Sequence, residues 1–373
     1  MSTPHFHSLF VKRIDPLTAQ SAAITLAIPS DLRDTFAFTP GQFVTLRAVV
    51  GGESVRRSYS LCSTPGHLAS AQEVTVGIKR VDKGVFSTWA TTALQVGDEL
   101  DVMAPDGRFT PKAAFSSAPG QSGQDAHRLG IAAGSGITPI LSIMAHTLAA
   151  EPRSRFTLVY GNQRSNTIMF NEALQDLKDR YNERVSLVYV LSRQTQEIDL
   201  FHGRLDDAKL SGLLQQTVAT RQITEVFICG PEAMLESAER AVAHAGIARE
   251  RVHTERFSSN HTTKKVAAPA IPQELSGQNA YAFALEVVLD GKAHSFGMQA
   301  EDNVLDTALN GGLDLPYACK GGVCCTCRAK VLEGKVTMEK NFTLEQWEID
   351  KGFVLTCQAH CVSAKVVVSY DER

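Results

Sequence analysis

The sequence lacks a surplus of positive charge, and this absence argues against partners that are strongly negatively charged. Its 373 residues include 37 Lys and Arg against 40 Asp and Glu, which gives a formal net charge of −3. A protein without a basic field has little to hold a nucleic-acid backbone, so we expect no nucleic-acid partner. With 43% hydrophobic and 21% charged residues, the composition also excludes a wholly disordered or fibrous chain.

Signals for secretion or membrane insertion are also missing. Residues Met1–His7 have neither the basic segment nor the apolar segment of a secretory signal. The 22 residues from Leu129 to Ala150 contain no Asp, Glu, Lys or Arg, and that length could span a bilayer. However, Gly134, Gly136 and Pro139 interrupt this stretch, which predicts a strand, a loop and a helix instead. We therefore expect a cytoplasmic protein without a membrane partner.

Changes of composition divide the sequence into three predicted domains. Residues 112–128 and 258–280 are rich in small and polar residues, which is typical of linkers. In residues 1–112, short apolar runs alternate with turn residues, a pattern that predicts an antiparallel β-barrel with one helix at Val85–Leu94. In residues 113–257, strand-like and helix-like runs alternate, which predicts an α/β domain with a parallel sheet.

A third, smaller domain is expected at residues 281–373, after a linker at residues 258–280. Asp290-Gly291 between two apolar runs is a strong hairpin signal. A helix-like run at Val304–Asn310 and three further apolar runs follow. This order resembles an α+β domain of the β-grasp type, so the chain is predicted to be multidomain.

Cysteines cluster in the third domain. Six of the eight lie between residues 319 and 361, and without a secretion signal such clustering favours metal binding over disulfides. The spacing Cys319-x4-Cys324-x2-Cys327, with Cys357 after 29 intervening residues, is that of plant-type [2Fe–2S] sites. Because each iron needs two thiolates besides the bridging sulfides, we predict these four cysteines as the ligands of a [2Fe–2S] cluster.

A zinc ribbon is the alternative interpretation of the same cysteines. Cys324-x2-Cys327 and Cys357-x3-Cys361 also form two pairs with a spacing that zinc accepts. That arrangement leaves Cys319 and Cys325 without a role and does not explain the pair Gly321-Gly322, which would let peptide N–H groups approach cluster sulfurs. The spacing favours the iron–sulfur cluster.

A glycine-rich loop predicts a phosphate-binding site in the second domain. Gly134-Ser-Gly136-Ile-Thr138-Pro139 follows an apolar strand and precedes a helix, which is the context that a phosphate loop needs. Pro139 replaces the third glycine of the usual dinucleotide fingerprint, so a plain Rossmann dehydrogenase is a poor match. No Asp or Glu ends the second strand, at Tyr160-Gly-Asn162, to bind a free ribose 2′-hydroxyl.

Several motifs together resemble the ferredoxin–NADP reductase superfamily. Arg57-Ser-Tyr-Ser60, followed by Val76–Arg80 and Gly84-Val-Phe-Ser87, is similar to its FAD site. Arg57 can pair with a pyrophosphate, and Tyr59 offers a flat face to the isoalloxazine ring. The G-x-G-x-x-P loop, Cys229-Gly-Pro-Glu-Ala-Met234 and His253–Phe257 are similar to the nucleotide and nicotinamide segments, although Phe257 replaces the usual Tyr.

The resemblance implies FAD and NADPH as cofactors. A Ser-Arg pair such as Ser192-Arg193 holds the 2′-phosphate of NADP in plant-type reductases, and Arg suits phosphate geometry; an ordinary surface cation is the alternative for Arg193. By resemblance Ser60, Cys229 and Glu255 are the catalytic residues. The predicted cofactor-binding residues are Arg57, Ser58, Tyr59, Ser60, Ile78, Lys79, Gly84, Val85, Phe86, Ser87, Gly134, Gly136, Thr138, Pro139, Ser192, Arg193, Cys229, Gly230, Pro231, Met234 and Phe257.

The domain order resembles that of reductase components of bacterial oxygenases. Within that group, Cys319–Gly334 with its doubled Cys324-Cys325, Phe353–Gln358 and Lys365–Tyr370 resemble the reductase subunits of phenylacetyl-CoA epoxidases. The resemblance implies electron transfer from NADPH through FAD and the [2Fe–2S] cluster to the di-iron oxygenase subunits of such a complex. The alternatives are the reductase of another oxygenase, such as a ketosteroid hydroxylase, or a zinc-bearing nucleotide-binding regulatory protein.

Overall fold

The structure is a computed structural model that describes residues 5–112, 126–257 and 281–372. These residues form two compact units, with most of residues 7–257 in one and residues 281–372 in the other. The predicted linker at 258–280 and most of the one at 112–128 lie outside the described residues. Within the described ranges, no helix combines the length and the apolar character that crossing a bilayer requires.

The first part of the larger unit is an antiparallel sheet that closes on itself. Its strands are β1 Phe6–Thr18, β2 Ser21–Ala27, β3 Phe43–Val50, β4 Glu53–Ser60, β5 Glu73–Lys79 and β6 Glu99–Met103, in the order β4-β3-β6-β1-β2-β5. An antiparallel bridge from Leu61, just after β4, to Val76 in β5 joins the two edges. Alternating apolar residues fill the interior, and the predicted barrel is confirmed.

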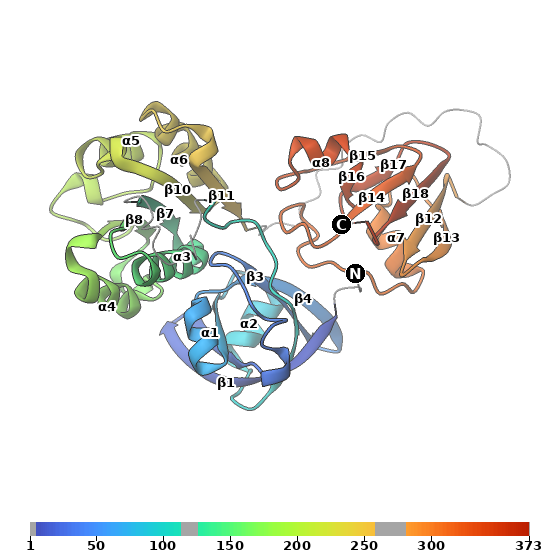
Figure 1. Cartoon of the computed structure of the whole chain (residues 1–373), viewed down its shortest axis with the longest axis horizontal. Helices are drawn as coiled ribbons and strands as arrows, with labels where there is room; N and C mark the ends of the chain where they lie inside the picture. The colour runs from blue at the N-terminus through green and yellow to red at the C-terminus, as the bar shows by residue number, and fades with distance from the viewer. Residues whose placement is uncertain (1–4, 113–125, 258–280, 373) are drawn as a thin grey trace. The chain divides into compact units, whose positions relative to one another are not determined.

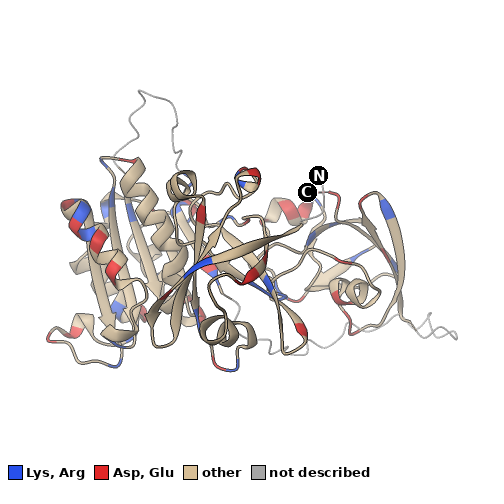
Figure 2. Ribbon diagram, turned by 90° about the horizontal axis from the view of Figure 1, so that it is seen from below, with Lys and Arg blue, Asp and Glu red and all other residues tan. Residues whose placement is uncertain are grey.

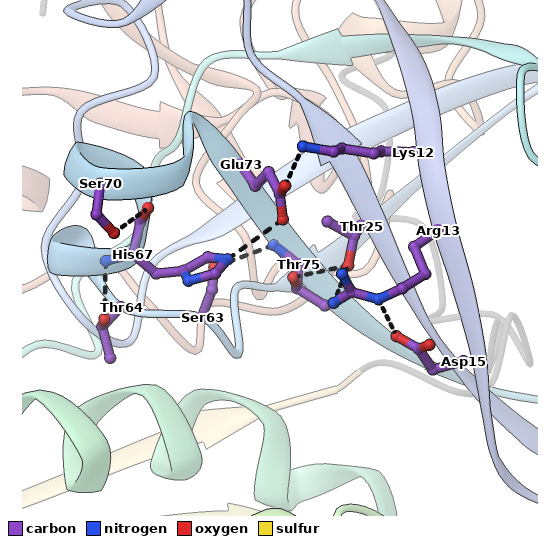
Figure 3. Close-up of polar contacts among 10 residues, drawn as sticks. All are labelled: Lys12, Arg13, Asp15, Thr25, Ser63, Thr64, His67, Ser70, Glu73 and Thr75. Carbon is purple, nitrogen blue, oxygen red and sulfur yellow. Dashed lines mark hydrogen bonds and ion pairs between the residues drawn. The ribbon is translucent and has the colours of Figure 1, made fainter.

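Two helices accompany the barrel. The predicted helix is α2, Val85–Thr92, whereas α1, Pro65–Ala71, was not predicted. The Thr64 side chain caps α1 by accepting a hydrogen bond from the His67 backbone N–H at 3.2 Å. Figure 3 shows the His67 ring reaching Glu73 at the start of β5, at 3.3 Å, while Lys12 of β1 binds the same carboxylate. These contacts fix α1 against the barrel.

The second part of the larger unit is a five-stranded parallel sheet. Its strands are β7 His127–Ala133, β8 Arg155–Asn162, β9 Val185–Leu191, β10 Ile223–Gly230 and β11 Val252–Arg256, in the order β11-β10-β7-β8-β9. Helices α3 Ile137–Ala150 and α4 Asn171–Tyr181 pack on one face, and α5 Asp207–Gln216 and α6 Glu232–His244 on the other (Figure 1). The predicted α/β domain is confirmed, with Pro231 at the N-cap of α6.

A buried ionic network lies near the amino ends of these strands. Arg128 is only 1% exposed and donates to Glu225 at 3.0 Å and to Glu151 at 2.7 Å. Glu225 also binds His253 at 3.1 Å and the Lys112 backbone N–H at 2.8 Å. Because both charges of each pair are satisfied by several partners, the desolvation cost of the network is offset.

The smaller unit is a mixed sheet covered by a helix. Strands β12 Phe283–Leu289, β13 Lys292–Met298, β14 Arg328–Glu333, β16 Phe353–Leu355 and β18 Lys365–Ser369 are ordered β13-β12-β18-β14-β16, with β12 and β18 parallel. Helix α7, Val304–Asn310, packs on the sheet, and α8 Gln346–Asp350, β15 Val336–Met338 and β17 Ala359–Cys361 complete the unit. The parallel central pair and the crossing helix confirm the predicted β-grasp.

Charged residues of both signs are spread over both units. Figure 2 shows Lys and Arg interspersed with Asp and Glu on helices and strands alike. This distribution agrees with the nearly balanced composition of the sequence.

Candidate functional site

The glycine-rich loop between β7 and α3 forms a tight turn before a helix. Gly134 has φ +56° and Gly136 lies so close to β10 that a Cβ atom there would be 2.1 Å from the Cys229 carbonyl oxygen. The Thr138 hydroxyl donates to the Ser135 carbonyl at 3.0 Å and steadies the turn. The loop therefore leaves the N-terminus of the 14-residue α3 open, a geometry that suits a phosphate group.

A buried tyrosine lies behind this loop. The Tyr160 hydroxyl donates to the Gly134 carbonyl at 2.8 Å, and Tyr160 is fully buried. The buried Asn162 side chain, two residues further along β8, hydrogen-bonds to the Tyr160 hydroxyl. From the sequence, Tyr160 and Asn162 were noted only because neither is the Asp or Glu that would bind a free ribose 2′-hydroxyl.

The three predicted catalytic residues converge in the larger unit. The Ser60 hydroxyl, at the end of β4, donates to the Glu255 carboxylate at 3.2 Å. Glu255 in β11 is the register partner of Cys229 in β10. The chain segments that carry Ser60 and Glu255 are 195 residues apart in sequence, so only the tertiary fold brings these side chains together.

Burial shifts the proton affinities of two of these groups. The Glu255 side chain is half-buried, and desolvation of its carboxyl raises the pKa to about 8, partly offset by the Ser60 hydrogen bond. Burial raises the pKa of the fully buried Cys229 thiol well above its usual value, and the neighbouring Glu255 charge raises it further. At neutral pH the pair therefore consists of a carboxylic acid and a thiol, neither of them charged.

The barrel places a lysine beside the nucleotide loop. The Lys79 ammonium, at the end of β5, lies 3.3 Å from the point where a Cβ of Gly134 would be. Burial lowers the pKa of Lys79, so the group gains from an anionic partner. Gly77 in the same strand lets Thr138 approach, since a Cβ at Gly77 would be 2.6 Å from the Thr138 Cγ2 atom. The phosphate loop thus faces a cation from the other domain of the same unit.

The predicted FAD segment lies on β4 and at the start of α2. Gly84 directly precedes α2, and a Cβ added at Gly84 would be 2.4 Å from the Val81 Cγ2 atom. The Ser87 hydroxyl accepts a hydrogen bond from the Val81 N–H at 3.2 Å. The side chains of Ile78 and Phe86 are buried in the barrel core, so only their backbone groups are left to meet a cofactor. Tyr59 is half-buried against Phe86, with ring centroids 5.7 Å apart.

The guanidinium of Arg57 and the side chain of Val85 complete this segment. Arg57 in β4 donates to the carbonyl of its neighbour Arg56 at 2.7 Å, and Val85 is exposed at the first position of α2. Ser58 lies between Arg57 and Tyr59 on the same strand. An arginine on a strand and a glycine-led helix start are the donor groups that a pyrophosphate needs.

Two loops meet at the far edge of the parallel sheet. The Ser192 backbone N–H donates to the Asn162 carbonyl at 2.9 Å, and that of Arg193 to the Gln163 carbonyl at 2.8 Å. The Gln194 side chain then accepts the Ser165 N–H at 2.9 Å. The Arg193 side chain is exposed at this edge, where a phosphate could reach it.

The remaining predicted nucleotide residues surround the end of β10. Pro139 and Met234 are buried within α3 and α6, and the Met234 methyl would be 2.7 Å from a Cβ at Gly230. Phe257 follows β11 and is 38% exposed. Gly230 and Pro231 connect Cys229 to α6, so the sequence motif at 229–234 forms one continuous turn beside Gly136.

The four predicted metal ligands form two pairs of thiols in the smaller unit. Cys319 and Cys324 hydrogen-bond to each other, as do Cys327 and Cys357. Cys319 is half-buried and the other three are buried. The Gly321 N–H donates to the Cys319 sulfur at 3.2 Å, and the Gln358 amide approaches the Cys357 sulfur at 3.6 Å. Donors directed at thiolates stabilise the charge of an iron–sulfur cluster.

These pairs fit a two-iron cluster better than one zinc ion. Cys361, which the zinc ribbon requires, instead has its thiol 3.4 Å from the Met298 sulfur. The buried Thr326 hydroxyl hydrogen-bonds to the Cys324 sulfur, so it is a further donor directed at a predicted ligand.

Family models match each of the three parts. The oxidoreductase FAD-binding domain matches residues 10–110, the oxidoreductase NAD-binding domain residues 131–240, and the 2Fe-2S iron-sulfur cluster binding domain residues 287–362. The chain is an oxidoreductase with FAD, NAD and [2Fe–2S] domains, as the motifs predict.

Relatives match the chain over nearly its whole length. One of the subunits of 1,2-phenylacetyl-CoA epoxidase from Escherichia coli is 42% identical over 99% of this chain and 98% of that protein. The ferredoxin reductase component of 3-ketosteroid-9-alpha-monooxygenase from Rhodococcus rhodochrous is 34% identical over 97% of this chain and 96% of that protein. Phthalate dioxygenase reductase has the same fold, with a TM-score of 0.57 and 19% identity over 98% of both chains. The chain therefore belongs to the FAD- and [2Fe–2S]-containing reductases of the ferredoxin–NADP reductase superfamily, the family of this epoxidase component and of the ketosteroid monooxygenase reductases.

Proposed function

We propose that the protein takes electron pairs from NADPH and delivers them singly to the di-iron oxygenase subunits of a phenylacetyl-CoA epoxidase, in aerobic phenylacetate degradation. The observation that carries this proposal is the 42% identity to the Escherichia coli epoxidase component over 99% of the chain. When bound, FAD supplies the chemistry of accepting a hydride and releasing its electrons one at a time.

Each group of residues has a proposed role. Arg57, Ser58 and Gly84–Ser87 bind the FAD phosphates, and Tyr59 lies against the flavin ring. Gly134, Gly136 and Lys79 hold the nucleotide pyrophosphate, which is supported by the cation beside the open loop. Ser60 would hydrogen-bond near the flavin N5, and Cys229 and Glu255 would help to place the nicotinamide; desolvation keeps both titratable groups uncharged at neutral pH. Cys319, Cys324, Cys327 and Cys357 hold the cluster.

NADPH is the proposed electron donor rather than NADH. Ser192 and the exposed Arg193 would bind the ribose 2′-phosphate at the edge where the loops after β8 and β9 are joined. Glu and Asp are absent from Tyr160-Gly-Asn162 at the end of β8, where a carboxylate would favour a free 2′-hydroxyl.

The domain boundaries and compartment are part of the same proposal. We place the FAD domain at residues 1–112, the NADP domain at 113–257, a linker at 258–280 and the ferredoxin domain at 281–373, in agreement with the spans of the three family matches. None of the eight cysteines is in a disulfide, which supports a reducing compartment such as the cytoplasm.

A ketosteroid monooxygenase is the second candidate client. The reductase components of such enzymes are 34% identical to this chain. The higher identity to the epoxidase component favours phenylacetyl-CoA epoxidase.

Reconstitution tests the proposed client. The purified protein, which should show flavin and iron–sulfur absorbance, is mixed with the oxygenase subunits of each system, and NADPH oxidation coupled to product formation is measured. We expect phenylacetyl-CoA epoxidation with the epoxidase subunits. Coupling to the steroid hydroxylase alone would contradict the proposed client, and a colourless protein would contradict the reductase itself.

A pair of adjacent cysteines provides a matched test of the cluster. Cys324→Ser should abolish electron delivery to the oxygenase while FAD-dependent ferricyanide reduction remains, since the two sites lie in different domains. Cys325→Ser, one residue away and outside the predicted ligand set, should leave both activities in place. Equal effects of the two substitutions would contradict the ligand assignment.

A further inference from the structure

A chain of buried hydroxyl groups ends at one of the cysteine pairs. The Thr356 hydroxyl donates to the Cys327 carbonyl at 2.9 Å. The Tyr370 hydroxyl lies 2.6 Å from the same Thr356 oxygen. Because Thr356 has only one hydroxyl proton, and that proton points to Cys327, Tyr370 must be the donor in the second bond. The chain therefore runs in one direction, from Tyr370 through Thr356 to Cys327.

Thr356 connects the backbone of both cysteines of the pair. It precedes Cys357 in sequence, and its backbone N–H donates to the Cys327 carbonyl at 3.1 Å in addition to the hydroxyl bond. Its own carbonyl accepts the Leu305 N–H at 3.1 Å, at the start of α7. A change in the position of Thr356 would thus move Cys327 and Cys357 together.

The other end of the chain is anchored in the sheet. Tyr370 follows β18, which lies between β12 and β14, and its backbone N–H donates to the Val288 carbonyl of β12 at 3.0 Å. Tyr370, Thr356, Cys327 and Cys357 are all buried. A phenol has an ordinary pKa of about 10, so Tyr370 carries its proton at neutral pH and remains a donor. In the dry interior its dipole acts with little screening.

We propose that Tyr370 is a positioning residue for the [2Fe–2S] cluster, which acts through Thr356 on the Cys327–Cys357 pair. The inference rests on the proposed role of these cysteines as cluster ligands. Two effects follow from the geometry. The relay fixes the backbone that carries both thiols, and it directs the positive ends of two O–H dipoles toward the Cys327 carbonyl. Such dipoles favour the more negative, reduced state of a cluster, so the relay should raise its reduction potential.

The experiment uses the full-length holoprotein and replaces one hydroxyl at a time. Tyr370→Phe removes the first donor and Thr356→Val the second, whereas Thr356→Ser retains the hydroxyl and should restore the native behaviour. Tyr281→Phe, at an exposed tyrosine of the same domain, is the matched control. The measurements are the midpoint potential of the cluster, the EPR spectrum of the reduced protein, and the rate at which a chelator removes iron.

We expect a more negative potential and about tenfold faster iron loss in Tyr370→Phe and Thr356→Val, a size that one buried hydrogen bond accounts for. Flavin content and ferricyanide reduction should be unchanged. A potential, EPR spectrum and iron-loss rate in Tyr370→Phe equal to those of Tyr281→Phe would overturn the proposal. Should Tyr370→Phe fail to fold, the comparison of Thr356→Val with Thr356→Ser decides the same question. Absence of iron from the unmutated protein would instead refute the proposed function.

Discussion

We predict that the rate of flavin reduction falls at alkaline pH through the ionisation of one carboxyl group, that of Glu255 in the proposed hydride-transfer site. Burial raises the pKa of the Glu255 carboxyl to about 8. About nine tenths of the molecules therefore hold a neutral Glu255 at pH 7, and about one tenth at pH 9. An ionised carboxylate in a poorly solvated site would oppose the negative charge that arrives with a hydride. We therefore expect the rate of flavin reduction by saturating NADPH to fall about tenfold from pH 7 to pH 9.

Glu255→Gln isolates this effect. The amide is neutral at every pH and can still accept the hydrogen bond from Ser60, so the rate near neutrality should be retained and the alkaline loss should disappear. Glu239→Gln is the matched control, because Glu239 binds Thr254 and Arg256 of the same strand rather than Ser60. Stopped-flow flavin absorbance at pH 6 to pH 9.5 gives the profile. An alkaline limb that persists in Glu255→Gln, or a flat profile in the unmutated protein, would refute the reasoning.

The same ionisation changes stability with a defined sign. A carboxyl group whose pKa is about 8 in the folded protein and 4.5 when unfolded binds more protons in the folded state between these values. The contribution of Glu255 to the free energy of unfolding is therefore complete below pH 4.5 and is lost as the pH rises through 8. At a pH above both pKa values, the loss in the free energy of unfolding amounts to roughly 5 kcal/mol. Glu255→Gln should accordingly flatten the fall of the unfolding midpoint on the alkaline side.

Three further predictions concern the nucleotide domain. Gly136→Ala should raise the KM for NADPH at least about tenfold, because the added Cβ would lie 2.1 Å from the Cys229 carbonyl oxygen. Gly66→Ala is the control, since its Cβ would be 3.7 Å from the nearest atom, and it should leave the KM unchanged. Equal KM values for the two variants would disprove the crowding argument. Arg193→Ala should weaken the binding of NADPH relative to that of NADH. An unchanged ratio of the kcat/KM values for the two coenzymes would show that Arg193 does not bind the 2′-phosphate. Glu225→Gln should lower the free energy of unfolding by about 3 kcal/mol. Burial opposes ionisation of Glu225, but hydrogen bonds from His253 and its other partners lower its pKa to about 2. The contribution of Glu225 to the free energy of unfolding is therefore present above pH 4.5 and is lost as the pH falls toward 2. Denaturation curves that Glu225→Gln leaves unchanged would contradict this prediction.

The sequence predicted the features whose residues lie close together in the chain. Cys319, Cys324 and Cys327 share one loop, so their spacing alone indicates the cluster. The strand, glycine loop and helix at 127–150 were likewise visible as a local pattern. Helix α1 was missed because it begins with Pro65-Gly66, a pair that indicates a turn in the sequence.

Contacts between distant segments could not be predicted. The Ser60–Glu255 bond joins two domains across 195 residues, and no spacing rule relates them. The Tyr160 bond to Gly134 and the Thr356 bond to Cys327 depend on strand register, which a single sequence does not specify. For this reason the predicted catalytic residues came from the family resemblance, whereas the hydrogen bonds of Tyr160 and Thr356 became visible only in the fold.

The close approach of Gly136 to β10 has a practical meaning for redesign of the coenzyme preference. Backbone meets backbone there, so the loop that we propose for the pyrophosphate has no room for an added side chain. Arg193, which we propose for the 2′-phosphate, is exposed to solvent, so a substitution there disturbs little packing. Libraries intended to switch the reductant should therefore randomise the loops after β8 and β9 and leave the glycine turn untouched.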